Sequence, residues 1–124
     1  MNIRARRFLI LFGVMAAVAV VAGAAWLFRE ASIAKNMRES REAGLSAYEA
    51  GDYNDETLRK LSYVAARDKD DGDVLYALAD TRRRVRMENG RHIVSAIAFA
   101  RAAKDALPDD PKPLELLLEL YALT

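Results

Sequence analysis

An uncharged run of 21 residues near the N-terminus constrains this chain more than any other feature. The run extends from Phe8 to Phe28 and reads FLILFGVMAAVAVVAGAAWLF. As a helix it would span roughly 30 Å, about the thickness of the hydrocarbon core of a bilayer. We therefore predict one transmembrane helix over residues 8–28, with Phe8, Trp26 and Phe28 as its membrane-anchoring residues.

The charges before this run predict its orientation. Arg4, Arg6 and Arg7 lie in a basic tip formed by residues 1–7, and positive residues favour the cytoplasmic side of a membrane. We expect a single-pass protein of a bacterial-type inner membrane, with a cytoplasmic N-terminus and an extracytoplasmic C-terminal part. A cleaved signal peptide stays open as an alternative, because Ala22-Gly23-Ala24 has the small residues of a cleavage site.

Length and composition argue against an enzyme. The 124 residues leave room for one small domain beside the span, and the chain has no cysteine and one histidine. The sequence has no nucleophile elbow, no phosphate-binding glycine loop and no metal-ligand spacing. We therefore expect no catalytic activity, no cofactor, no metal and no small-molecule substrate. With a net charge of only +1 and no interleaved aromatic residues, we also expect no nucleic-acid partner.

Apolar spacing after the span predicts helices and no strand. The helical pattern continues without proline from Arg29 to Glu49, so residues 29–39 read as a helical linker between the span and a first soluble helix. A second helix follows the turn at residues 51–54, capped by Asn54 or Asp55. A third begins after the acidic run 68–73 and is closed by Asn89-Gly90, a fourth ends near residue 108, and a fifth covers 114–123. The predicted fold class is all-α.

These helices recur at a regular interval. Asp70-Asp71 and Asp109-Asp110 open equivalent helices 39 residues apart, close to the roughly 34-residue period of two-helix repeats. Residues 40–124 resemble the tetratricopeptide repeat (TPR) family at these positions: Gly44, Tyr48, Gly51-Asp52-Tyr53, Leu78, Ala79, Ala96, Ala100, Ala103, Pro108, Leu117 and Tyr121. The resemblance implies a short TPR-like solenoid of about two and a half repeats, the second being about five residues longer near residues 84–91.

The resemblance also implies a binding groove, lined mainly by the first helix of each repeat. The groove residues expected to contact a partner protein are Arg41, Leu45, Tyr48, Tyr76, Asp80, Arg83 and Arg84, with Asp73 beside them. Tyrosines and arginines next to carboxylates suit an extended peptide. We expect a membrane-anchored protein–protein interaction module that scaffolds an envelope or membrane assembly. The alternative is a small structural subunit of a membrane protein complex, packing through its span and its apolar last helix.

Four further features have a structural and a functional interpretation. Arg82, Arg83, Arg84, Arg86 and Arg91 form an anion-docking patch or simply complement the end of a helix dipole. The acidic run 68–73 is expected to cap a helix rather than bind calcium, and His92 to be a solvated surface residue. The last helix is apolar nearly all round, which predicts either a continuation of the chain or docking on a partner.

Overall fold

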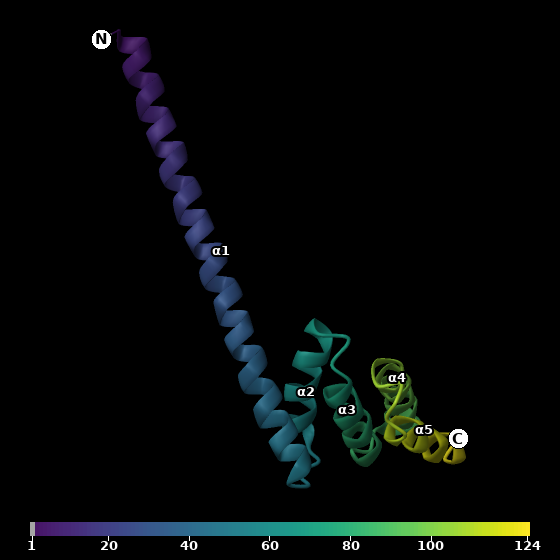
Figure 1. The fold of residues 1–124 in the computed structure, drawn as a ribbon. Coiled ribbons are helices and arrows are strands. Elements are labelled where there is room, and N and C mark those ends of the chain that lie inside the picture. The colour runs from purple at the N-terminus through teal and green to yellow at the C-terminus, as the bar shows by residue number, and fades with distance from the viewer. Residues whose placement is uncertain (1) are drawn as a thin grey trace. The chain divides into compact units, whose positions relative to one another are not determined.

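The computed structural model describes residues 2–124, and these form helices without a strand (Figure 1). The five α-helices are α1 (Ile3–Glu49), α2 (Asp55–Arg67), α3 (Gly72–Arg84), α4 (Arg91–Ala106) and α5 (Lys112–Ala122), with a short 3₁₀ turn, η1 (Glu88–Gly90), before α4. The chain divides into two compact units, residues 1–36 and residues 37–124. We call these the N-terminal unit and the C-terminal unit.

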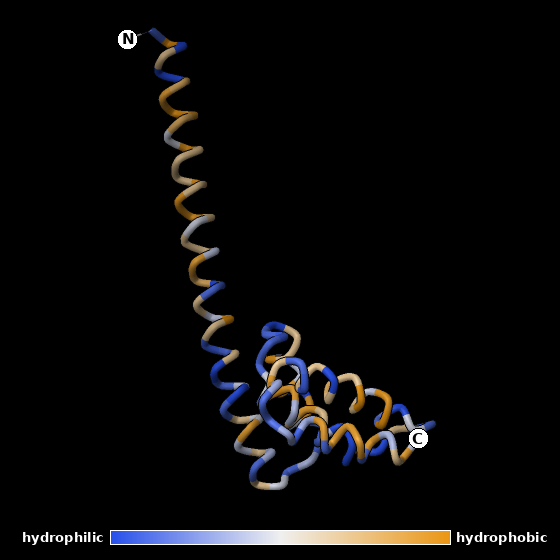
Figure 2. The backbone as a smooth tube through the Cα atoms, turned by 45° about the vertical axis from the view of Figure 1, so that its right-hand side comes forward, coloured by the Kyte–Doolittle hydropathy of each residue, from blue (hydrophilic) through white to orange (hydrophobic). Residues whose placement is uncertain are grey.

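The described residues of the N-terminal unit lie almost entirely in the first part of one helix, α1. Helix α1 continues from the apolar run into the C-terminal unit without a break, as the uninterrupted helical pattern predicts. Figure 2 shows the apolar run in orange, with hydrophilic residues at both of its ends. All of its large hydrophobic side chains are exposed. The segment is long and apolar enough to cross a membrane, and it is a helix of the kind that a signal sequence also forms.

Local signals explain where the helices of the C-terminal unit begin. Asn54 caps α2, because its side-chain oxygen accepts a hydrogen bond from the Thr57 backbone N–H at 3.0 Å. Asp71 caps α3 in the same way through the Val74 N–H. The acidic run 68–73 thus supplies a helix cap, as predicted. Gly51 has a φ of +82°, which suits the tight turn between α1 and α2.

Helix α3 ends earlier than the sequence pattern suggests. Val85 is its C-cap, and Asn89-Gly90 does not close α3 but forms η1, where both residues have positive φ and start α4. The prediction that Arg86 lies in the last turn of this helix is therefore wrong. Residues 85–90 connect α3 to α4, in the region where the resemblance implies additional residues.

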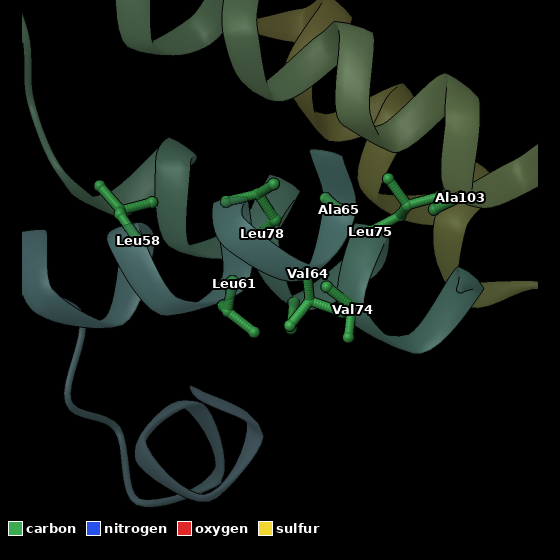
Figure 3. Packing of buried hydrophobic residues seen from close by; sticks show 9 residues of the cluster. Leu58, Leu61, Val64, Ala65, Val74, Leu75, Leu78 and Ala103 are labelled. Atoms are coloured by element: carbon green, nitrogen blue, oxygen red, sulfur yellow. The ribbon is translucent and has the colours of Figure 1, made fainter. Parts of the chain in front are cut away.

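Two hydrophobic clusters hold the C-terminal unit together. The first joins α2, α3 and α4 through residues that include Leu61, Leu78 and Ala103, and the end of α1 packs against it (Figure 3). The second joins α3, α4 and α5 through residues that include Ala100 and Leu120. Tyr76 contacts both clusters. Consecutive helices therefore share continuous buried surface from α1 to α5.

Two glycines permit the closest approaches. A Cβ on Gly44 would lie 2.9 Å from Leu61 Cδ2, so the absence of a side chain lets α1 approach α2. A Cβ on Gly72 would lie 2.3 Å from Leu107 Cγ. The start of α3 and the turn between α4 and α5 are thus packed directly against each other, which brings that turn to the edge of the site described below.

Candidate functional site

A pocket of about 530 Å³ opens between the end of α1, the start of α3 and the turn that leads into α5. Its lining combines two tyrosines, apolar side chains and charges of both signs: Arg41, Leu45, Tyr48, Glu49, Asp73, Tyr76, Ala77, Leu107, Asp110 and Lys112. All of these residues belong to the C-terminal unit. A concave, largely preformed surface of this composition is typical of a binding site.

The pocket contains five of the eight residues predicted to line a groove: Arg41, Leu45, Tyr48, Asp73 and Tyr76. Asp80, Arg83 and Arg84 do not line it. Sequence reasoning missed Glu49, Ala77 and Leu107, as well as Asp110 and Lys112 from the α4–α5 turn. Glu49 and Ala77 are each one residue from a predicted position, whereas the turn residues enter the site only through the contact of Leu107 with Gly72.

Asp80 is the centre of the largest polar network beside the pocket. Its side chain is almost fully buried, with 5% exposure for the residue. It accepts hydrogen bonds from the Tyr48 hydroxyl at 2.7 Å and from an Arg83 Nη at 2.6 Å. Arg84 Nε lies 3.4 Å from the same carboxylate. A carboxylate with this many donors is satisfied where it lies, so it serves to hold α1 and α3 together.

The predicted Gly51-Asp52-Tyr53 turn contributes to the same network. The guanidinium of Arg84 lies 4.4 Å from the centre of the Tyr53 ring, and that ring meets Tyr48 edge to face at 5.9 Å. Cation–π and edge-to-face contacts of this kind fix side-chain orientation. Arg84 is therefore engaged by both Asp80 and Tyr53.

A second ion-pair group lies at the pocket edge. Arg41 Nε donates to Asp71 Oδ2 at 2.7 Å, and an Arg41 Nη lies 3.8 Å from Asp73. Asp71 also caps α3, so Arg41 ties α1 to the start of α3. The hydrogen bond from Arg41 to Asp71, together with the nearby carboxylates, raises the pKa of Arg41, and its charge is therefore permanent.

Burial and the Asp80 charge also shift the pKa values of other groups in the site. Burial raises the pKa of Tyr48 well above its usual value, and the hydrogen bond to Asp80 adds to this effect. Burial and the Asp80 charge raise the pKa of Tyr76 as well. Burial lowers the pKa of Arg83, but the charge of Asp80 and its hydrogen bond outweigh burial, so that the pKa is raised overall. Both tyrosines are therefore neutral at physiological pH.

The arginine cluster divides into separate contacts. Arg83 donates to Glu119 on α5 at 2.5 Å in addition to Asp80, and Arg82 contacts the Met87 sulfur. Arg86 and Arg91 are exposed. The cluster thus does not form one continuous patch of free guanidinium groups. Arg82, Arg83 and Arg84 nevertheless occupy the last turn of α3, where positive charge complements the helix dipole.

His92, which was predicted to be a surface residue, is partly exposed and makes one backbone contact. Its Nδ1 accepts a hydrogen bond from the Met87 backbone N–H at 3.2 Å. The ring thus supports the segment between α3 and α4. Within residues 2–124 no group of three histidine, aspartate or glutamate side chains is arranged to hold a metal ion.

The predicted anchor and topology residues lie in the N-terminal unit. Phe8, Trp26 and Phe28 are exposed on α1, and Arg4, Arg6 and Arg7 lie in its first two turns. Exposed aromatic and aliphatic side chains over this length are costly in water and favourable in lipid.

Helix α5 buries one face and exposes another. Leu116, Leu117 and Leu120 are buried in the second cluster, whereas Leu114 and Leu118 are exposed by 45% and 62%. The helix was predicted to be apolar nearly all round; its exposed surface carries Glu115 and Glu119 as well as these leucines.

No protein-family model, curated protein or solved structure matches this chain.

Proposed function

We propose that this chain is a membrane-anchored protein–protein interaction module whose C-terminal unit binds an extended segment of a partner protein. The observation that supports this proposal is the 530 Å³ pocket with its two tyrosines. Tyrosine offers a large rigid surface and a polar tip, which makes it effective in recognising peptides. The described residues that line the pocket include no nucleophile–base pair, so binding is the activity that this lining supports.

The arrangement of the helices is consistent with TPR-like repeats. The pocket is lined by the end of α1, by α3 and by the start of α5, which correspond to the first helices of the three repeat units in the resemblance. Helices α2 and α4 then serve as the second helices, packed behind them. In this proposal the C-terminal unit is a short solenoid with its binding groove on the first-helix side.

The membrane part of the proposal concerns orientation. We place the N-terminus in the cytoplasm and the C-terminal unit outside a bacterial-type inner membrane, where it would scaffold an envelope assembly. The support is the position of Arg4, Arg6 and Arg7 before the apolar run. Protease added to intact spheroplasts should digest residues 37–124, and protection until the membrane is permeabilised would reverse the assignment.

A pocket-filling substitution tests the binding function. Asp73 has a side chain that is 71% exposed at the pocket edge, so Asp73→Trp places an indole over the pocket without disturbing the core. Arg59→Trp on α2 is the matched control, because Arg59 is exposed and does not line the pocket. The full chain is purified from membranes in mild detergent. Asp73→Trp should no longer recover the partner proteins, whereas Arg59→Trp should still recover them. Equal recovery of the partner proteins with the two variants would reject the proposal.

One observation favours a second candidate, a structural subunit of a membrane complex. The exposed side chains on α5, including Leu114, Leu118 and Tyr121, form an apolar surface that would suit packing against another subunit. The same purification separates the two candidates. Loss of partners with Leu118→Lys but not with Asp73→Trp would identify α5, rather than the pocket, as the interface.

A further inference from the structure

The structure pairs the arginines of the predicted groove with carboxylates. Arg83 is held between Asp80 and Glu119 at 2.6 and 2.5 Å, and Arg84 lies near Asp80 with its guanidinium over the Tyr53 ring. These cations already have carboxylate partners, so they are not available to bind an acidic ligand at physiological pH.

Arg41 is neutralised as well. It forms its closest ion pair with Asp71 at 2.7 Å, and Asp73 lies farther away at 3.8 Å. Since one guanidinium serves two carboxylates here, the group carries one excess negative charge. Asp73 is the more exposed of the two carboxylates and is the one that lines the pocket.

The remaining charges of the pocket are mostly negative. Glu49 is exposed and forms no ion pair within residues 2–124. Asp110 and Lys112 carry opposite charges, and the Asp110 carboxylate accepts a hydrogen bond from the Lys112 backbone N–H at 3.0 Å. Among the lining residues and the polar network connected to them through Arg41 and Tyr48, the carboxylates are Glu49, Asp71, Asp73, Asp80, Asp110 and Glu119, and the cations are Arg41, Arg83, Arg84 and Lys112. Six negative and four positive charges leave a net charge of −2.

The interior of the pocket suits the rest of a cationic side chain. Leu45 and Leu107 offer apolar surface to the methylene stem of a lysine or arginine. Tyr48 and Tyr76 also line the pocket, and the faces of aromatic rings attract cations. The Tyr48 hydroxyl is committed to Asp80, so this tyrosine contributes its ring rather than a free donor.

We infer that the pocket binds a lysine or arginine side chain from an extended segment of the partner protein, with its stem on the leucines and its cation at the tyrosines, Glu49 and Asp73. The inference rests on the proposed function, that this pocket binds a protein segment, and adds the chemistry of that segment. Charge complementarity selects this occupant over an acidic or C-terminal carboxylate peptide, because the described lining carries more carboxylates than cations and its one arginine, Arg41, is already paired with Asp71.

Selection from a random peptide library tests the inference directly, because the library itself supplies the ligand. The full chain is placed in lipid nanodiscs and used to select phage-displayed random dodecapeptides. The enriched peptides should share a lysine or arginine, and binding should be lost with Asp73→Trp. A synthetic copy with citrulline for arginine, or norleucine for lysine, keeps the shape of the side chain and removes its charge, and it should bind at least about tenfold more weakly.

Charge variants of the protein provide the reciprocal measurement. Glu49→Gln together with Asp73→Asn should weaken binding of the selected peptide about three- to tenfold. The matched control is Glu88→Gln with Asp105→Asn, which removes two exposed carboxylates away from the pocket and should leave affinity unchanged.

The possible outcomes separate the inference from the proposed function. Neutral or acidic peptides that bind wild type and are blocked by Asp73→Trp would overturn the cationic specificity while the binding function stands. If the citrulline or norleucine peptide bound as tightly as the charged peptide, the cationic specificity would likewise be overturned and the binding function would stand. Failure to enrich any peptide, or peptides that bind Asp73→Trp as well as wild type, would overturn the binding function itself.

Discussion

Replacing Asp80 by alanine should destabilise the C-terminal unit more than any other substitution in the polar network. Asp80 is the shared acceptor of Tyr48, Arg83 and Arg84. Its removal leaves the part-buried Tyr48 hydroxyl and the Arg84 guanidinium without this acceptor, while Arg83 keeps only Glu119. The loss in free energy of unfolding should therefore be largest for Asp80→Ala, smaller for Tyr48→Phe and smallest for Arg84→Ala.

The magnitudes follow from burial. Breaking a fully buried ion pair costs about 3–5 kcal/mol, but the Arg83 and Arg84 side chains are 23% and 43% exposed, so water compensates part of the loss. We expect about 2–3 kcal/mol for Asp80→Ala. Tyr48→Phe removes one hydrogen bond to a charged acceptor and should cost about 1–2 kcal/mol. Arg84→Ala, at a longer distance and more exposed, should cost less than about 1 kcal/mol.

Thermal unfolding of the full chain in detergent micelles measures these differences. All five tyrosines lie in the C-terminal unit, so the near-UV circular dichroism of tyrosine follows that unit. For a unit of this size about 1 kcal/mol corresponds to about 4–8 °C, so Asp80→Ala should lower Tm by about 10–20 °C. If Asp80→Ala melted within a few degrees of Arg84→Ala, Asp80 would not be the residue that holds α1 to α3, and the role given to it here would be refuted.

Three other predictions concern pH and packing. Because the pKa of Tyr48 is raised in the folded state, the unfolded chain ionises first, near pH 10, and stability should fall above that pH. Between about pH 8 and 11 the urea midpoint should fall less for Tyr48→Phe than for wild type. An identical fall of the midpoint in both proteins would contradict this prediction. Gly72→Ala should cost about 1–3 kcal/mol by overpacking against Leu107, and adding Leu107→Ala should recover part of that loss in urea titrations. Leu117→Ala should cost about 2–5 kcal/mol and Leu118→Ala under about 0.5 kcal/mol by the same titrations, since only the first is buried; equal losses would show that α5 packs through another face.

The helices were predictable because their signals are local. The apolar spacing of α2 and α3, the caps Asn54 and Asp71 and the turn at Gly51 all act within a few residues along the chain. The end of α3 was not predictable in the same way. Val85 continues the apolar spacing, but the chain turns there and forms η1, supported by the backbone contact to His92.

The family resemblance implied Leu45, Tyr48 and Tyr76 as groove residues, and all three line the pocket between α1 and α3. The pairing of charges could not be predicted, because it depends on which carboxylate each arginine reaches across helices. Asp80 pairs with Arg83 and Arg84, and neither arginine lines the pocket.

Site-specific photocrosslinking in intact membranes tests most directly whether the pocket of the anchored chain binds a partner protein. A benzoylphenylalanine at Glu49, which lines the pocket, is compared with one at Arg59, which does not. Both positions are exposed, so the fold tolerates both. We predict a discrete protein adduct from position 49 that position 59 does not give and that Asp73→Trp removes. The same adduct from both positions, or an adduct at 49 that persists with Asp73→Trp, would contradict the proposed binding function.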